Sequence, residues 1–414
     1  MTDLGEELGG RLRMNRKATA ATLAAAFLAM SMFVGTNAGA QDNHVKWSYL
    51  LYLCADNNLD TYVGPGHYSV VEDDFAELIS VGSTKDVAAY VLVDRWNGPA
   101  YLWKVGKGSM EEMKSSPLNG KEINMGDPAT LRSFVQFASE ANPADHTLLV
   151  FWDHGSPRSV ASDDHTSDAG GYDSLTHYEV FEALNGYTID VLGADECNVG
   201  QVEVAYEYAT RTSTGYLVAA ETYTGWRGFP YDATLRELTD HPEMTPMEAA
   251  VMMIDQTQLL LNKPPYMQER INSHSAVDLS KVGDLVSSIK RLAGLLTPDI
   301  DDYMTIINKA RGNAQYCYGA NAINLVDLRT FVTTIGAKTS SKEVKEACAA
   351  VLTSFDAAVL KVHATSSLQN MVHGLGIALP NHSWEMPSYY EKFAFAGQGW
   401  LDFLKAYWAA SGSV

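Results

Sequence analysis

The sequence predicts an α/β protein with a mostly parallel β-sheet flanked by helices, and three observations support this class. Between residues 47 and 240, apolar runs of strand length alternate with amphipathic runs of helix length, the order that is typical of parallel sheets with crossover helices. The strand-like runs are apolar throughout, as in strands that are buried on both faces. The 414-residue chain is 46% hydrophobic and 19% charged, an ordinary globular balance with ample material for a core.

The strands and helices of residues 47–240 follow from composition and from the residues at their ends. Strands are expected at the apolar runs 47–55, 86–94, 146–155, 188–197 and 214–221. Helices are expected where apolar residues recur at helical spacing, over 70–81, 128–141, 174–186 and 202–212. Pro128 suits the first turn of its helix, and Gly186 suits the end of its own. The sequence DNNLD after the first strand predicts a turn.

After about residue 240 the pattern becomes largely helical. Thr245, Pro246 and Glu248 suit the N-cap, first-turn and capping-box positions of a helix. Further helices are expected over 282–296, much of 343–362 and 399–408, with one strand over 374–380. We therefore expect three parts along the chain: an N-terminal segment over 1–40, a sheet domain over 41–240, and a helical region over 241–414 that packs on the sheet.

The first 40 residues differ from the rest of the chain. Four basic residues precede the apolar stretch ATAATLAAAFLAMSMFVG, which leads into the small-residue sequence TNAGA. This order is typical of a secretory signal peptide, with cleavage expected after Ala40 and a mature protein in the cell envelope, the periplasm or the medium. The alternative is a retained N-terminal anchor, whose apolar length is close to the minimum for a membrane span.

Without its first 40 residues the chain is strongly acidic. It then carries 47 Asp and Glu against 26 Lys and Arg, for a net charge of −21. Such a surface repels the phosphates of nucleic acid, which excludes nucleic acid as a partner. It attracts basic peptides, although simple solubility outside the cell explains the charge equally well. A membrane is expected as a partner only through an uncleaved N-terminal segment.

Two of the expected strands end in reactive side chains. The first ends in Asp153, His154 and Gly155, and the second in Asp195, Glu196 and Cys197. Between them lie a loop and a single helix, enough for one right-handed crossover, which makes the two strands parallel. Because functional groups gather beyond the carboxyl ends of parallel strands, His154 and Cys197 are expected side by side at one rim of the sheet.

A histidine beside a cysteine suits nucleophilic acyl transfer. The thiolate is the nucleophile, and an imidazole can take the thiol proton and return it to a leaving amine. The backbone N–H groups of Gly155 and Cys197 would stabilise the oxyanion. Each side chain alone has a plainer explanation, since a thiol after an apolar strand is usually a buried hydrophobe, and a histidine at a strand end is usually a loop residue. On spacing alone, both interpretations stay open.

Several segments resemble the clostripain family of cysteine peptidases. In the order seen in that family, they are WSYLLYLCADNNLD, INMGDPATLRSFV, LLVFWDHGS, SLTHYEVFEAL, IDVLGADECNVGQVEVAYEY, GFPY, VHGLGIALP and YYEKFAFAGQGWLDFLKAYW. Together they cover most of residues 47–408. The resemblance implies a caspase-like fold and an endopeptidase whose His–Cys dyad maps onto His154 and Cys197. It also implies cleavage after arginine or lysine.

Asp195 occupies the position, two residues before the cysteine, where the resemblance places an acidic residue in the primary specificity pocket. A carboxylate there would pair with a substrate guanidinium or ammonium group, an interaction worth about 3 kcal/mol when it is desolvated. The alternative from local structure is that Asp195 caps a helix that begins near Val199.

Three residues depart from the family pattern. Glu196 stands where a small residue is commoner, and if it points inward its charge would disfavour the thiolate of Cys197. Pro157 stands where glycine is frequent, so the loop after His154 is expected to run differently. Arg158 is the only Lys or Arg between His154 and Cys197, which makes it the candidate site for self-processing. Its closeness to His154 argues against cutting there and favours a single active chain or processing by another enzyme.

No cofactor is expected to be required, and the zinc signatures CxxC and HExxH are absent from the sequence. The loop 161–173 contains four aspartates among Ser and Gly, namely Asp163, Asp164, Asp168 and Asp173. Calcium is one interpretation, and clostripain itself is associated with calcium, but the spacing does not match an EF-hand and a solvated loop is favoured. Cys317 and Cys348 are candidates for a disulfide that the sequence alone does not establish.

The sequence therefore predicts an exported endopeptidase in which Cys197 attacks, His154 transfers the proton and Asp195 selects a basic residue before the cut. The alternative from another class is a catalytically weak or silent binding protein that retains the peptidase fold and captures peptides. Glu196 and the unfavourable position of Arg158 support this alternative. A metal-dependent hydrolase that uses the Asp/His loop is a third hypothesis.

Overall fold

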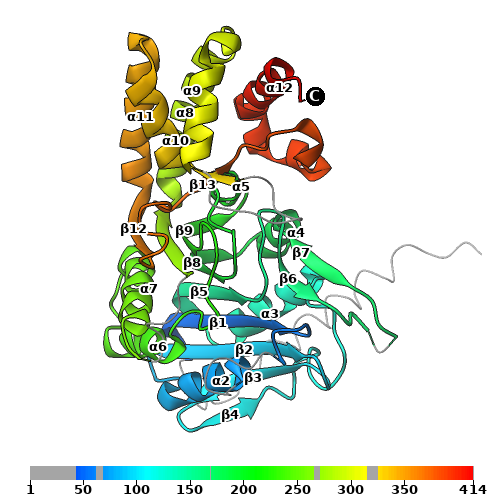
Figure 1. Ribbon diagram of the computed structural model, residues 1–414. Coiled ribbons are helices and arrows are strands. Elements are labelled where there is room, and N and C mark those ends of the chain that lie inside the picture. Colours follow the sequence, from blue (N-terminus) through cyan, green and yellow to red (C-terminus); the bar gives the residue numbers. More distant parts are fainter. Residues whose placement is uncertain (1–42, 62–68, 168, 265–270, 315–324, 414) are drawn as a thin grey trace, which may run out of the picture. The chain divides into compact units, whose positions relative to one another are not determined.

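The computed structural model describes residues 43–61, 69–167, 169–264, 271–314 and 325–413 (Figure 1). Residues 43–414 form one compact unit. The expected signal peptide or anchor lies outside the described residues. Among the residues that are described, no helix is both long enough and apolar enough to cross a membrane.

A nine-stranded sheet forms the centre of the described residues. Its strands, in spatial order, are β12 (Val359–Ala364), β10 (Ser273–Asp278), β9 (Ser213–Ala219), β8 (Thr188–Asp195), β5 (Ala144–Trp152), β1 (Val45–Ala55), β2 (Val87–Arg95), β3 (Tyr101–Gly106) and β4 (Ser109–Glu112). The strands from β9 to β2 pair in parallel, and Figure 1 shows them side by side. The outer pairs on both edges are antiparallel.

Helices cover both faces of this sheet. One face packs against α2 (Val70–Val81), α6 (Tyr231–Asp240) and α7 (Pro246–Leu261). The other packs against α3 (Pro128–Ala141), α4 (His177–Leu184), α5 (Val202–Arg211) and later helices. Strand β1 contributes to both cores because successive side chains point to opposite faces: Tyr52 and Cys54 join the α3 side, whereas Leu51 and Leu53 join the α2 side. The predicted α/β class is therefore confirmed.

The predicted capping residues at the starts of two helices are also confirmed. Thr245 accepts a hydrogen bond from the N–H of Glu248, and the Glu248 side chain bonds back, which completes the capping box of α7. Pro128 begins α3 directly after its N-cap, Asp127. These caps satisfy N–H groups that a helix start would otherwise leave without partners, and they set where each helix begins.

The C-terminal part adds several helices to the α5 side of the sheet. They are α8 (Val282–Leu296), α9 (Ile300–Ala314), α10 (Leu328–Lys338), α11 (Lys342–Ala358) and α12 (Trp400–Ser411), with short 3₁₀ turns at Leu279–Lys281, Ser383–Glu385, Ser388–Lys392 and Ala394–Gln398. Cys348 is a buried free thiol in α11, and its candidate partner, Cys317, lies outside the described residues. The domain boundary near residue 240 stays a prediction.

Two strands of this part differ from the expectation. Residues 359–364 form β12 instead of ending a helix, and they pair with β10. The strand expected over 374–380 is present as β13 (Gly376–Ala378), but it pairs with β11 (Leu325–Asp327) outside the main sheet. The sequence VLKVHA of β12 continues the apolar spacing of α11, so only the pairing with a distant strand decides its conformation.

A small ribbon follows β5 in the chain. Strand β6 (Ser159–Asp163) pairs with β7 (Asp173–Thr176) in antiparallel fashion. Part of the loop that the sequence predicted to be solvated therefore belongs to β6, and Asp163 is fully buried there. The prediction of a solvated loop is wrong for Asp163 because a strand pairing carries its carboxylate inward.

Candidate active site

Strands β5 and β8 are parallel neighbours that bring reactive residues to the same rim of the sheet. Their register pairs Trp152 with Asp195, so His154 and Cys197 each lie two residues beyond this pair. Both side chains line one pocket of about 280 Å³. The other lining residues are Leu59, Val70, Trp152, Asp153, Asp195, Thr224, Gly225, Trp226 and Gly228. The structure thus brings together the histidine, the cysteine and the aspartate that the sequence singled out.

Gly155 lies where the two strand ends meet. A Cβ atom on this residue would lie 2.5 Å from the Cβ atom of Glu196 and 2.8 Å from the carbonyl oxygen of Cys197. Both distances are far inside van der Waals contact, so the position requires glycine. The missing side chain allows the turn after β5 to close onto the turn after β8.

Cys197 is half-buried and carries a free thiol. The next residue, Asn198, has a φ of 60°, the left-handed conformation that asparagine adopts more readily than most residues. The N–H of Asn198 donates to the carbonyl oxygen of Thr222 at 2.6 Å and holds this turn. The N–H of Thr224 lies 3.4 Å from the sulfur of Cys197. A donor in this position stabilises the thiolate form.

His154 is exposed at the rim of the pocket, and its Nε2 atom lies 2.9 Å from Oδ1 of Asn58. Burial of the inner side of the ring lowers the pKa of His154, and the carboxylate of Asp164 opposes this shift. The net direction keeps the imidazole neutral at neutral pH. A neutral imidazole is the form that can accept a proton.

Two buried acidic residues, Asp153 and Glu196, adjoin the strand ends. Asp153 accepts hydrogen bonds from the amide of Asn57 and the N–H of Ser162. Glu196 accepts one from the N–H of Ala161 at 3.2 Å, and its other oxygen meets no donor among the described residues. Burial raises the pKa of Glu196 well above its usual range, and Asp153 raises it further. The raised pKa favours the neutral form of Glu196, which reduces the charge that the sequence placed beside the thiol.

Asp195 lines the pocket as a buried carboxyl group. Its Oδ2 atom accepts hydrogen bonds from the N–H of Phe229 and the hydroxyl of Tyr231, both at 2.8 Å. Its Oδ1 atom is buried and accepts no hydrogen bond from the described part of the chain. Burial raises the pKa of Asp195 to about 6, and the two donors limit the rise. Asp195 does not cap the following helix, because α5 begins at Val202 with Gln201 as its N-cap.

The backbone of Gly228 packs directly against the carboxyl group of Asp195. Its φ is 64°, a conformation that favours glycine, and a Cβ atom there would lie 2.2 Å from Oδ2 of Asp195. A side chain at this position would displace the carboxylate from its donors. The position of the Asp195 carboxylate therefore depends on a glycine from a distant segment of the chain.

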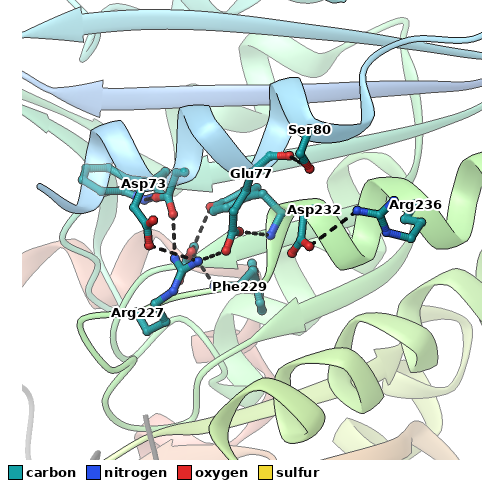
Figure 2. Close-up of polar contacts among 11 residues, drawn as sticks. Asp73, Glu77, Ser80, Arg227, Phe229, Asp232 and Arg236 are labelled. Atoms are coloured by element: carbon teal, nitrogen blue, oxygen red, sulfur yellow. Dashed lines mark hydrogen bonds and ion pairs between the residues drawn. The ribbon is translucent and has the colours of Figure 1, made fainter. Parts of the chain in front are cut away.

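The segment 224–229 forms one wall of the pocket, and ion pairs around the buried Arg227 and Asp74 hold it against α2. The guanidinium of Arg227 pairs with three carboxylates of that helix, Asp73, Asp74 and Glu77 (Figure 2). Arg227 is only 2% exposed, and its Nη1 atom lies 2.8 Å from Asp74. Removing either side of a buried ion pair leaves an uncompensated charge, so this cluster anchors the wall firmly.

The loop after His154 holds Arg158 on its outer side. The N–H of Ser156 donates to the carbonyl oxygen of Ser159 at 3.0 Å and closes the turn around the buried Pro157. Arg158 is exposed, and its guanidinium lies over the ring of Tyr389, 5.8 Å from the ring centroid. Self-processing at Arg158 stays a prediction. The side chain of Arg158 contacts Tyr389, which belongs to the C-terminal part of the chain.

A second group of acidic residues lies on the α3 side of the sheet. Oxygens of Asp56, Glu122 and Asp163 all lie within 4.8 Å of one another. Asp94 is fully buried at the end of β2, and neither of its carboxylate oxygens accepts a hydrogen bond of normal geometry from a described residue. Burial raises the pKa of Asp94 to about 9, and the three neighbouring carboxylates add to this rise, against a small lowering by the N–H of Arg95.

The four aspartates of loop 161–173 are divided by the structure. Asp163 belongs to this acidic group, whereas Asp164 and Asp173 are not members of it. Asp168 lies outside the described residues. The group combines side chains from the end of β1, from the segment before α3 and from β6, which sequence spacing does not connect.

Sequence reasoning missed three residues at the pocket: Asn58, Thr224 and Gly228. Asn58 belongs to the DNNLD segment, which was predicted only as a turn. Thr224 and Gly228 lie between β9 and α6, where no charged or nucleophilic motif draws attention to them. Their position in the chain could have revealed them. The turn with Asn58 follows β1 and the segment with Thr224 and Gly228 follows β9, so both begin at the carboxyl end of a parallel strand and reach the same rim as His154.

Known proteins share parts of this sequence and this fold. The model of the clostripain family, peptidase C11, matches residues 51–408. Clostripain from Hathewaya histolytica is 26% identical to this chain over an alignment of 239 residues, which covers 48% of this chain and 43% of that protein. The chain thus spans less than half of the length of this relative.

Two X-ray structures have a similar fold. A secreted C11 cysteine protease from Bacteroides thetaiotaomicron, in complex with an irreversible peptide inhibitor, aligns with a TM-score of 0.65 and 17% identity over 86% of this chain and 99% of that chain. An inactive zymogen C11 protease from Parabacteroides distasonis aligns with a TM-score of 0.63 and 17% identity over 86% and 98% of the two chains. They confirm the caspase-like α/β architecture. Since the family model matches most of its length, the chain belongs to the clostripain family.

Proposed function

We propose that this chain is an exported cysteine endopeptidase that cleaves peptide bonds after basic residues. The observation that carries the proposal is the single pocket that His154, Cys197 and Asp195 line together. Membership of the clostripain family supports the reaction class. The order of basic, apolar and small residues over 1–40 supports export, and one structural neighbour is described as secreted.

In the proposed reaction, the neutral imidazole of His154 takes the proton of the Cys197 thiol. The thiolate attacks the carbonyl carbon of the substrate, and the N–H groups of Gly155 and Cys197 stabilise the resulting oxyanion. When the tetrahedral intermediate collapses, the C–N bond breaks and His154 donates its proton to the leaving amine. Water then hydrolyses the thioester with His154 again as the base, which regenerates the thiol.

Asp195 is proposed to select the residue before the cut. Its Oδ1 atom is a buried acceptor that no described donor occupies, so it suits a cationic substrate group. Because Oδ2 already accepts two hydrogen bonds, a substrate guanidinium would donate to Oδ1 through its directed N–H groups, whereas an ammonium would bind there as a point charge. We therefore propose arginine as the main substrate residue and lysine as the second. The acidic surface of the chain favours the approach of basic peptides.

Fluorogenic peptides that end in Arg, Lys or Asp test this proposal, each with and without iodoacetamide. We expect cleavage after Arg and Lys that iodoacetamide abolishes, with alkylation at Cys197 seen by mass spectrometry. Peptide binding without turnover would favour a silent binding protein instead. Cleavage that resists iodoacetamide but stops with a chelator would favour a metal-dependent hydrolase.

We further propose that the acidic group of Asp56, Asp94, Glu122 and Asp163 holds a calcium ion with a structural role. Calcium prefers several carboxylate oxygens, and three of the four residues are fully buried. The buried Asp94 carboxylate, which accepts no hydrogen bond of normal geometry from a described residue, fits such an ion. Burying several carboxylates together is costly unless a cation or a proton compensates them. Bound calcium would tie β1, β2 and β6 together and would take no part in the proposed bond cleavage.

Calcium is expected to raise the melting temperature more at pH 8 than at pH 5. The folded-state pKa of Asp94 is raised to about 9, so without calcium this group favours folding at low pH, and that contribution is lost as the pH rises toward 9. Calcium would replace the proton at pH 8. The expected gain over EDTA is about 3 °C at a hundredfold excess of calcium over its Kd.

Two variants make the calcium test specific. Asp163→Asn should abolish the calcium-dependent shift in melting temperature, whereas Asp164→Asn, a change in the adjacent residue outside the group, should retain it. Equal melting temperatures of the unmodified protein in calcium and in EDTA at pH 8 would contradict the proposal.

A further inference from the structure

We infer that Asn58 is a third residue of the site, which holds the His154 ring so that its Nδ1 atom is left to accept the thiol proton. The inference deepens the proposed function and rests on it for its catalytic meaning. It starts from one contact, since Nε2 of His154 lies 2.9 Å from Oδ1 of Asn58. These residues are 96 positions apart in the chain, so the fold and not local sequence creates the contact.

The turn that carries Asn58 is fixed to the turn that carries His154. The neighbouring Asn57 is 2% exposed. Its Oδ1 atom accepts the N–H of Leu59 at 2.9 Å, which shapes the turn itself. Its Nδ2 atom donates to Asp153 Oδ1 at 2.8 Å and to two carbonyl oxygens at 3.1 Å, those of Cys54 and Ser162. One buried amide thus connects the Asn58 turn to the residue that directly precedes His154.

The chemistry of the contact sets the tautomer of the ring. An amide oxygen only accepts hydrogen bonds, so Nε2 must carry the hydrogen and donate it to Asn58. In neutral imidazole the other ring nitrogen, Nδ1, then has the free lone pair. The lone pair is what the proposed reaction requires for taking the proton from Cys197. Asn58 also limits rotation of an otherwise exposed ring, and it leaves Nδ1 as the unoccupied nitrogen of a side chain that lines the pocket.

A neutral amide suits this role better than a carboxylate. A carboxylate beside the ring would favour the charged imidazolium and raise the pKa of His154. Asparagine orients the ring without this effect, and burial lowers the pKa of His154 instead. The pair therefore supplies an oriented base that is neutral at neutral pH.

The main test replaces Asn58 and measures steady-state kinetics with an Arg peptide. Asn58→Ala should lower kcat about 10- to 100-fold, part of what a positioned base contributes, while KM changes less than about twofold. Asn58→Asp should restore much of kcat at high pH and move the acid limb of the kcat/KM profile up by about one pH unit. Thr61→Ala is the matched control. It removes a hydroxyl that bonds the carbonyl of Asn58 at 3.1 Å in the same turn, without contact to His154, and should leave kcat and the pH profile unchanged.

A second measurement does not depend on turnover. The ¹⁵N spectrum of His154, assigned with a His154→Gln variant, should show the Nε2–H tautomer in the unmodified protein and a mixture of tautomers in Asn58→Ala. Detection of the Nδ1–H tautomer in the unmodified protein would overturn the inference. So would an Asn58→Ala enzyme with unaltered kcat and pH profile. Failure of the proposed function gives a different result, because the unmodified protein itself would then show no thiol-dependent cleavage.

Discussion

Replacing Cys197 with alanine is expected to lower kcat/KM for an Arg peptide by about 10⁴-fold or more, the scale of loss seen when a covalent nucleophile is removed. The physical reason is that Cys197 is the only thiol among the described residues that line the pocket, and a thiolate is a far stronger nucleophile than a hydroxyl group. Cys197 is half-buried and lines the pocket with His154, and the N–H of Thr224 stabilises its thiolate. The measurement is turnover of a fluorogenic peptide by the purified variant.

The matched control for this variant is Cys348→Ala. Cys348 is also a free thiol, but it is buried in α11, and its removal should leave kcat/KM within about threefold of the unmodified enzyme. Circular dichroism should show the same helix and strand content in both variants. If Cys197→Ala retained more than a tenth of the activity, another residue would have to be the nucleophile, and the proposed mechanism would be wrong.

Replacing Asp195 with asparagine is expected to reduce kcat/KM for Arg peptides at least 100-fold while changing cleavage after neutral residues much less. Without the carboxylate, a substrate cation in the pocket stays desolvated and unpaired, which costs about 3 kcal/mol or more. Asparagine keeps the shape of the side chain and an oxygen that can accept the hydrogen bond from Phe229 or Tyr231. A fall in kcat/KM for this variant would therefore reflect the missing negative charge and not a collapse of the pocket.

Asp232→Asn is the control, because Asp232 lies on nearby α6 and pairs with Arg236 instead of lining the pocket (Figure 2). The Asp232→Asn variant should leave the preference for Arg unchanged.

The selecting role of Asp195 also predicts a pH effect in the unmodified enzyme. Since the pKa of Asp195 is about 6, the ratio of kcat/KM for Arg over a neutral residue should fall as the pH drops below 6. Equal losses for Arg and neutral peptides in Asp195→Asn would reject the selecting role of Asp195.

The central part of the fold was predictable because its signals are local. Strand β1 and helices α2 and α3 begin and end within two residues of the predicted positions, since apolar runs, Pro128 and helical spacing mark them directly. Strand β12 was not predictable in this way. Its residues continue the apolar spacing of α11, and only the pairing with β10 reveals a strand.

The same distinction holds for the site. His154 and Cys197 were found because each directly follows an apolar strand, and the crossover between them is short. Asn58 was missed because its contact with His154 depends on how two turns, joined by Asn57, fold against each other. Glu196 was predicted to place a charge beside the thiol, yet its burial and the neighbouring Asp153 raise its pKa and favour its neutral form. A sequence shows which groups are near a strand end, but their protonation depends on solvent exclusion, which only the packed structure defines.

The attachment of Arg227 to α2 bears on how specificity can be transplanted between relatives. Exchanging the segment 224–229 alone would install a buried guanidinium without its three counter-charges, which belong to a helix about 150 positions earlier in the chain. In a recipient scaffold without those carboxylates, the orphaned cation would cost about 3–5 kcal/mol. Chimeras should therefore inherit α2 and this segment as one module, and the two regions should diversify together during evolution.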